Sequence, residues 1–351
     1  MDNGISVYSG LNCSLEENLK LIETAATLGL RRLFTSVLIP EAGSPNLQTE
    51  FATVLIAAVE CDLEVIVDVT PETISDFDFA LDFEQITPRL DDGFNTRQIA
   101  ALSHIRRIML NASTITEEIL TTLADLEADF SNISALHNFY PHIHTGLDAN
   151  YFQHQNRLLK DCDVTVGAFA ASLDGRRRPP LMEGLPTVEV TRQFGVDLTA
   201  RYLTALGADF VIISDSLPTF AECSSLTALT DGEIILEARS TTTDTASLKL
   251  LSQGFQCRQE TSPAVIRAAN GRTLTKELGL TINPDNTPQP RDCGNVTIDN
   301  LNFGRYMGEV QIVKSALAPD PRANVVAQIN ETDLPLLGAL TPGKRFRFRF
   351  I

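Results

Sequence analysis

Short apolar, β-branched runs alternate with helical patterns along the first two-thirds of the chain. The runs predict eight strands, at 4–8, 32–37, 63–69, 87–91, 105–111, 132–139, 163–170 and 208–215. Helical periodicity follows each run, at 15–28, 47–61, 72–83, 96–103, from 114 onward, and at 150–161, 186–206 and 220–229. Ser14 and Glu17 have the spacing of a capping box, so the first helix should begin at Leu15 and end before Gly29.

These strand–helix units predict a (β/α)8 barrel, an α/β fold, over residues 1–231. Nearly continuous apolar strands that alternate with amphipathic helices are typical of parallel strands covered by helices. Eight units in about 230 residues match the size of such a TIM barrel. An open, doubly wound sheet is the main alternative, but no G-x-G-x-x-G motif follows the first strand.

The pattern changes after Asp231 and predicts a second domain over residues 232–351. Helical periodicity largely stops, and β-like segments are expected at 233–238, 264–268, 295–298, 307–313 and 324–329. The tail 345–350 alternates strictly, which predicts a strand with phenylalanines facing the core and arginines facing solvent. We expect a small, mostly antiparallel β barrel, with this last strand at a sheet edge where its charges prevent aggregation.

Composition and charge exclude several classes of function. The 351 residues include 28 Lys and Arg against 45 Asp and Glu, and the formal charge of −17 argues against nucleic acids or anionic membrane surfaces as partners. The apolar runs are too short to cross a bilayer. Six cysteines without CxxC spacing, together with the lack of a recognisable signal peptide, predict a cytoplasmic protein with reduced thiols.

The active site of a barrel of this kind lies at the carboxyl ends of its strands. Acidic residues at these ends, or in the loops after them, are candidate catalytic groups: Asp68, Asp92, Glu183 and Asp215. Paired carboxylates suit glycoside hydrolysis, in which one is protonated and the other ionised. Helix capping is the alternative role for Asp92 and Asp215. Candidate substrate-binding residues at the same ends are Tyr8, Ser36, Asn111, His137, Asn138 and Tyr140.

Arginines are candidate anion ligands in this acidic chain. One guanidinium of the run 176–178, for which we choose Arg178, is suited to bind a phosphate or carboxylate bidentately. Alternatively, the arginines of this run lie in a solvated loop and pair with nearby acids. The second domain has further scattered arginines, among them Arg258 and Arg267, which either reach a ligand in an interdomain cleft or are ordinary surface charge.

A metal site is considered at His137, His142 and His144, because the last two have a spacing known from metal sites. The pair follows Pro141 in a loop rather than lying on a strand, and three ligands would be needed, so no metal or cofactor is expected. The sequence has no P-loop, H-E-x-x-H or G-x-S-x-G motif, which leaves nucleotide hydrolysis, zincin and serine-hydrolase chemistry without support.

Several longer motifs, taken in order, resemble one bacterial family. They are GISVYSG (4–10), RRLFTSVLIPE (31–41), VIVDVTP (65–71), RLDDGF (89–94), ALHNFYPHIHTGLD (135–148), EGLPTVE (183–189), VIR (265–267), GNVTIDN (294–300), GRYMGE (304–309) and NVV (324–326). The set is similar to the 6-phospho-N-acetylmuramidases, also labelled outer surface proteins, along essentially the whole chain. The family combines a TIM barrel with a cyclophilin-like second domain.

The resemblance implies a cytoplasmic glycosidase that splits the 6-phosphorylated N-acetylmuramyl–N-acetylglucosamine disaccharide during cell-wall recycling, without metal or cofactor. From their positions at the strand ends, we choose Asp68, Asp92 and Glu183 as the acid and the nucleophile or base, with Asp215 in reserve and the individual roles left open. Arg178 and Arg267 would hold the phosphate or the lactyl carboxylate.

Two positions depart from the family's pattern. His142 stands where an arginine usually follows HNFYP, and Phe255 stands where a histidine is usual. A lost arginine would weaken a phosphate contact or shift the specificity toward another phosphosugar. A catalytically silent phosphosugar-binding protein and a metal-dependent barrel hydrolase that uses the three histidines therefore stay open as alternatives.

Overall fold

The structure is a computed structural model, and it describes residues 1–36, 46–74, 83–229 and 232–351. The chain divides into two compact units, Met1–Leu229 and Thr230–Ile351, each with its own sheet. None of the helices in the described ranges has both the length and the apolar character needed to cross a membrane.

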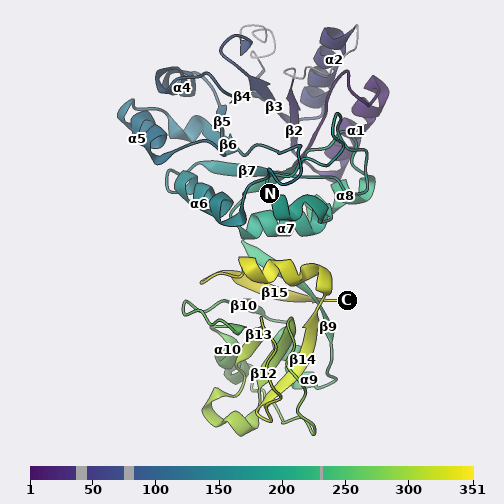
Figure 1. Cartoon of the computed structure of the whole chain (residues 1–351), viewed down its shortest axis with the longest axis vertical. Coiled ribbons are helices and arrows are strands. Elements are labelled where there is room, and N and C mark those ends of the chain that lie inside the picture. The colour runs from purple at the N-terminus through teal and green to yellow at the C-terminus, as the bar shows by residue number, and fades with distance from the viewer. Residues whose placement is uncertain (37–45, 75–82, 230–231) are drawn as a thin grey trace. The chain divides into compact units, whose positions relative to one another are not determined.

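The first unit is a closed barrel of parallel strands (Figure 1). Its strands are β1 (Gly4–Ser6), β2 (Arg32–Ser36), β3 (Glu64–Val69), β4 (Ile86–Leu90), β5 (Ile108–Asn111), β6 (Ile133–Leu136), β7 (Thr165–Ala170) and β8 (Phe210–Ile213). They pair in chain order, and β1 also pairs with β8, which closes the barrel. The predicted (β/α)8 barrel is confirmed.

Helices cover the outside of the barrel (Figure 1). They are α1 (Leu15–Leu28), α2 (Leu47–Glu60), α4 (Thr96–Ser103), α5 (Glu117–Asp125), α6 (Ala149–Lys160), α7 (Val196–Ala205) and α8 (Phe220–Ser225). α1 begins and ends as its sequence predicts. Ser14 Oγ accepts the Glu17 N–H at 3.2 Å, the Glu17 carboxylate accepts the Ser14 N–H at 2.9 Å, and Gly29 takes a left-handed φ of 85°.

Two predicted helix starts are wrong, and one prediction lies mostly outside the described residues. α5 is capped by Thr116, whose hydroxyl accepts the Ile119 N–H, rather than starting at Thr114. The helix expected over 186–206 begins only at Val196, and the residues before it form a separate 3-10 turn at Glu189–Gln193. Most of the stretch 72–83 is not described.

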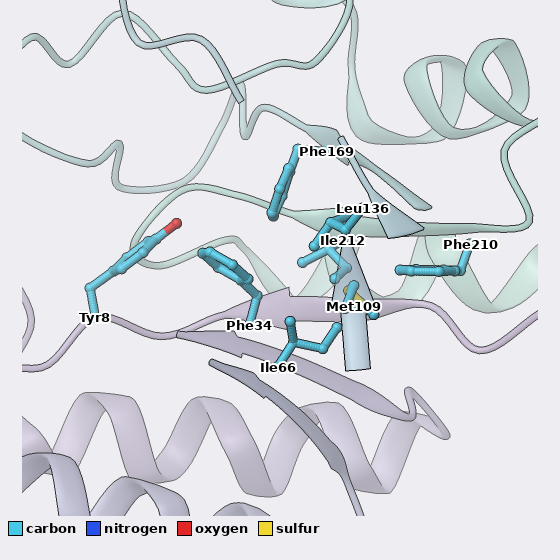
Figure 2. Close-up of a cluster of buried hydrophobic side chains, with 8 residues drawn as sticks. All are labelled: Tyr8, Phe34, Ile66, Met109, Leu136, Phe169, Phe210 and Ile212. Atoms are coloured by element: carbon cyan, nitrogen blue, oxygen red, sulfur yellow. The ribbon is translucent and has the colours of Figure 1, made fainter. Parts of the chain in front are cut away.

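The barrel interior is filled by side chains from most of its strands. Figure 2 shows this cluster, which consists of Tyr8, Phe34, Ile66, Met109, Leu136, Phe169, Phe210 and Ile212. Phe34 and Phe169 meet edge to face, with ring centres 5.0 Å apart. Because these residues pack the barrel solid, a ligand has access only to the ends of the strands.

The second unit is a seven-stranded mixed sheet, a β half-barrel. Its order is β10 (Gly254–Gln256), β15 (Arg345–Phe350), β9 (Glu233–Ser240), β14 (Ala323–Ile329), β12 (Asn295–Asp299), β13 (Val310–Val313) and β11 (Val265–Arg267). The sheet is antiparallel except for β9 and β15, which run parallel. Two short helices, α9 (Thr245–Leu251) and α10 (Gly271–Glu277), accompany it, although periodicity predicted no helix here.

The last strand, β15, is not an edge strand, which corrects the prediction. It lies between β10 and β9, and its alternating arginines pair with acids of β9: Arg347 with Glu233 at 3.0 Å and Arg349 with Glu237 at 2.7 Å. The phenylalanine face is buried as predicted at Phe346 and Phe348. Phe255 stacks on Phe346 with ring centres 5.5 Å apart, so the residue that departs from the family's histidine is part of this core.

Candidate active site

Asp68, near the carboxyl end of β3, is bound by Arg89 of β4. The strand register sets these residues opposite each other, and Arg89 Nη1 donates to Asp68 Oδ1 at 2.7 Å. The other donors of Arg89 bind the Leu136 carbonyl and, at 2.6 Å, Asn138 Oδ1. Arg89 is 2% exposed and Asp68 9%. One guanidinium thus fixes two of the predicted site residues at the carboxyl ends of the strands.

The protein environment favours the protonated form of Asp68. Burial raises the pKa of its carboxyl group above the ordinary value, and the negative charge of Asp91 adds to this effect. The charges of Arg89 and Arg178 act in the opposite direction. A carboxyl group with a raised pKa holds its proton closer to neutral pH, as a general acid requires.

Removing the guanidinium that binds Asp68 is expected to destabilise the barrel. In Arg89→Met the buried oxygens of Asp68, Leu136 and Asn138 lose their hydrogen-bond donor, which costs about 1–3 kcal/mol for each buried group left unsatisfied. Urea denaturation should show this loss, whereas Arg97→Met, at an exposed position of α4, should change the free energy of unfolding by at most about 0.5 kcal/mol. Equal stability of the two variants would contradict a structural role for the pair.

Arg178 lies over an aromatic wall at the same end of the barrel. Its guanidinium carbon is 4.8 Å from the centre of the Tyr8 ring and 5.5 Å from that of Phe139. Phe139 meets Phe169 edge to face, with centres 5.1 Å apart, which connects this wall to the barrel core. Cation–π contacts of this kind contribute about 0.5–2 kcal/mol and hold the guanidinium in place.

The guanidinium of Arg178 has no acidic partner within the described ranges, and its Nε is buried without a hydrogen bond. A half-buried cation with free donors is a preformed site for an oxyanion, since Arg presents a planar fork that matches phosphate and carboxylate. Arg178 lies over the ring of Tyr8, which follows β1, so it lies at the same end of the barrel as Asp68, and its charge acts on the Asp68 carboxyl group.

Asp215 holds the segment that carries Arg178. Its Oδ1 accepts the Arg178 N–H and its Oδ2 accepts the Ser172 N–H, both at 2.9 Å, and it is 0% exposed. Burial raises its pKa even though these hydrogen bonds oppose the shift. Because both oxygens are occupied and out of reach of solvent, we assign Asp215 as a positioning residue and not as a reserve acid.

His137 directly follows β6, and its side chain faces the helix layer. Its ring is fully buried and lies against Phe152 of α6, with ring centres 4.6 Å apart. Nε2 donates to Asn156 Oδ1 at 3.0 Å, so Nδ1 is the acceptor for the Ser113 hydroxyl at 3.1 Å. Ser113 Oγ also accepts the Asn138 N–H at 2.9 Å. His137 therefore supports the loop beside the site through Ser113.

The buried His137 predicts acid sensitivity. Burial lowers its pKa from 6.5 to about 4, so the native state resists a proton that the unfolded state accepts. Stability should therefore fall as the pH drops from about 6.5 to about 4, by about 3 kcal/mol in total. Denaturation at several pH values should show this slope in the wild type and in His154→Gln, an exposed control, but not in His137→Gln. An unchanged slope in His137→Gln would contradict the assignment.

The other predicted residues of the barrel lie at the carboxyl ends of the strands or in the loops after them. Asp92 is exposed after β4, and Glu183 is half-buried after β7, where its Oε2 accepts the Ile143 N–H at 2.9 Å. Ser36 lies opposite Asp68 in the strand register. Asn111 Oδ1 accepts the Ser113 N–H at 3.1 Å, and Tyr140 is half-buried, which raises its pKa.

The three histidines considered for a metal site do not form one. Both ring nitrogens of His137 are engaged, and His142 Nδ1 contacts the Ile143 carbonyl at 2.6 Å. Across the described ranges, no three His, Cys, Asp or Glu side chains are arranged to hold a metal ion. The set of three ligands that the metal alternative needs is therefore not assembled from these residues.

Both units match models of one family. Residues 3–228 match "6-phospho-N-acetylmuramidase, N-terminal", and residues 233–349 match "6-phospho-N-acetylmuramidase, C-terminal". The chain belongs to the 6-phospho-N-acetylmuramidase family. The resemblance inferred from the sequence motifs is thus confirmed, and the family is named as a muramidase, which is a glycosidase.

Two solved structures are similar to this family member along its whole length. An uncharacterized B. cereus protein has a TM-score of 0.82 and 27% identity, and the match covers 99% of this chain and 100% of that chain. A conserved Enterococcus faecalis protein of unknown function has a TM-score of 0.65 and 28% identity, with 100% and 96% covered. No protein with curated annotation matches the sequence significantly.

In the C-terminal domain of this muramidase-family chain, the predicted ligands Arg258 and Arg267 bind an internal acid. Glu309, 3% exposed, pairs with Arg258 at 3.3 Å, with Arg267 at 2.5 Å and with Arg272 at 3.5 Å. One buried carboxylate is thus shared by three partly exposed arginines. Arg267 is therefore less available for a phosphate than Arg178.

Sequence reasoning missed two arginines that shape the site of this muramidase-family barrel. Arg89 is the one charged residue of its strand, and a lone charge in a buried strand could have indicated a buried ion pair. Arg192, 4% exposed, donates to the carbonyls of Tyr140 and His142 at 3.0 Å and of Gly184 at 2.9 Å. It connects the loops after β6 and β7, but the expected helix 186–206 placed it on a helix surface.

Proposed function

We propose that this chain hydrolyses the 6-phospho-N-acetylmuramyl–N-acetylglucosamine disaccharide by carboxylate acid/base chemistry at the carboxyl ends of the barrel strands. The observation that carries the proposal is that two complementary groups lie at the same end of the barrel: Asp68, whose pKa burial raises, and Arg178, which forms no ion pair among the described residues. One group suits a proton donor, and the other suits the phosphate or lactyl carboxylate of the sugar.

In the proposed reaction, Asp68 gives its proton to the glycosidic oxygen as the bond from that oxygen to the anomeric carbon breaks. Water supplies the hydroxyl group that replaces the leaving sugar, and its remaining proton returns the acid to its starting state. A second carboxylate stabilises or attacks the anomeric carbon, or activates the water. Asp92 and Glu183, in the loops after β4 and β7, are the candidates for this role.

The sugar hydroxyls have polar partners available at the same strand ends. We assign this orienting role to Ser36, Asn111, Asn138 and Tyr140, with Tyr8 in the aromatic wall. Arg178 is preferred over Arg267 as the anion ligand, since Arg267 is already paired with Glu309.

We place the reaction in the cytoplasm, as a step in cell-wall recycling. The family match supports a muramic-acid substrate, and all six cysteines are free thiols, as is usual in a reducing compartment. A phosphorylated sugar is also a substrate class that cells generate internally.

Product release from matched disaccharides tests the proposal. The purified full chain should release N-acetylglucosamine from the 6-phosphorylated disaccharide and much less from the unphosphorylated one, with no loss of activity after treatment with a chelator. Binding of the phosphorylated disaccharide by calorimetry, without product release over hours, would instead identify a silent binding protein. Activity that disappears with the chelator would favour a metal-dependent hydrolase.

A further inference from the structure

The second unit contains an open pocket of about 910 Å³ whose walls carry more positive than negative charge. Its cationic side chains are Arg272, Lys276 and Arg305, and its acidic side chain is Glu277. A volume of this size is in the range of small-molecule sites. The formal charge of the whole chain is −17, so a concentration of cations here is not a consequence of composition.

Close packing holds α10, which carries two of these cations, against Gly308. A Cβ on Gly271, the first residue of α10, would lie 2.8 Å from the Gly308 carbonyl oxygen, and one on Gly308 would lie 2.1 Å from Thr275 Oγ1. The helix therefore rests directly on Gly308. Arg272 and Lys276 are four residues apart on α10, so they lie on the same face of the helix.

The ring of Tyr306 lies close to the guanidinium groups of both arginines of the pocket, Arg272 and Arg305. The guanidinium carbons of Arg305 and Arg272 are 4.9 Å and 5.5 Å from the centre of this ring. Arg305 Nη2 also donates to the Tyr306 hydroxyl at 2.8 Å. Two long side chains are thus ordered by one aromatic residue, which lowers the entropic cost of closing them on a ligand.

The positive charge of the pocket's cationic side chains is only partly neutralised by carboxylates of the described residues. Glu309 is shared among Arg258, Arg267 and Arg272, and in the described part of the chain neither Lys276 nor Arg305 forms an ion pair with a carboxylate. Like charges held close together repel each other, and an anion bound among them offsets this repulsion.

We propose that this pocket binds a phosphomonoester, as carried by a sugar phosphate. Guanidinium forks and an ammonium group match the oxygens of a phosphate dianion, and the rest of the pocket leaves room for the sugar. The pocket lies wholly in the second unit and includes none of the residues assigned to the barrel site. The proposal therefore does not depend on the proposed glycosidase activity.

Met307 provides a local probe, because it lines the pocket while Met109 and Met182 lie in the barrel unit. The full chain would be labelled with 13C at its methionine methyl groups, and the Met307 signal assigned with Met307→Leu. Glucose 6-phosphate is expected to shift the Met307 signal saturably, and glucose at the same concentration is not. Inorganic phosphate should produce a weaker saturable shift if the sugar adds contacts and an equal one if the phosphate alone is recognised.

Arg305→Gln and Lys276→Gln should each weaken the binding of glucose 6-phosphate at Met307 about tenfold, the expected effect of losing one charge-assisted hydrogen bond. Arg239→Gln, which removes an exposed arginine of β9 outside the pocket, is the control and should leave the affinity unchanged. Unshifted Met109 and Met182 signals in the variants would report an intact barrel. The proposal is overturned if Met307 shows no saturable shift, if glucose shifts it equally, or if both pocket variants bind like the control.

Discussion

Asp68→Asn is expected to lower the turnover of the phosphorylated disaccharide by a factor of about 10²–10⁴, the usual contribution of a general acid. The amide oxygen of asparagine still accepts the 2.7 Å hydrogen bond from Arg89, so the side chain should keep its position. The amide has no proton of suitable acidity for the leaving oxygen. The loss should therefore appear in kcat, whereas KM should change little.

The pH profile gives this prediction a second readout. A general acid must be protonated, so the activity of the wild type should decline as the pH rises through the pKa of Asp68, which burial raises above its ordinary value. This alkaline decline should be absent from the residual activity of Asp68→Asn. Asp125→Asn, at an exposed position of α5, makes the same chemical change away from the site and should behave as the wild type does. Near-native turnover by a folded Asp68→Asn variant would remove Asp68 from the mechanism.

The barrel was predictable from sequence because its evidence is local. The capping box at Ser14 and the apolar run of β3 each fix an element from residues that are neighbours in the chain. Asp68 was found in the same way, since the end of a predicted strand gives its position. The helix expected over 186–206 failed because Glu189 and Arg192 have helical spacing but are engaged in holding loops.

Contacts between distant segments were not predictable by this reasoning. Arg89 meets Asp68 because β3 and β4 pair in one particular register, which no local pattern encodes. The three arginines around Glu309 are brought together by the fold of the second unit in the same way. The orientation of His137 could have been predicted in part. Side chains alternate between the two faces of a strand, and Leu136 points into the barrel interior, so the next side chain points toward the helices.

Arg178→Gln is expected to raise KM for the phosphorylated disaccharide by about 10- to 100-fold, since hydrogen bonds to charged groups contribute about 1.5–3 kcal/mol. Glutamine retains a donor but neither the charge nor the two-pronged fork. Hydrolysis of the unphosphorylated disaccharide should change much less, so the variant should lose the preference for phosphate. Arg178→Lys restores the charge without the fork and should recover only part of the affinity.

Arg176→Gln is the matched control, because it makes the same change two residues away in the same loop. Arg176 is already paired with Glu17 at 2.8 Å, and the pair is more than a third exposed, so its loss should leave the discrimination between the two substrates intact. If both variants raised KM equally, a general effect of the loop or of net charge would explain the result, and Arg178 would not be the phosphate ligand. A selective effect of Arg178 would show how an acidic chain recognises an anionic sugar: it uses one cation that forms no ion pair within residues 1–36, 46–74, 83–229 and 232–351, while Arg176 in the same loop is neutralised by Glu17.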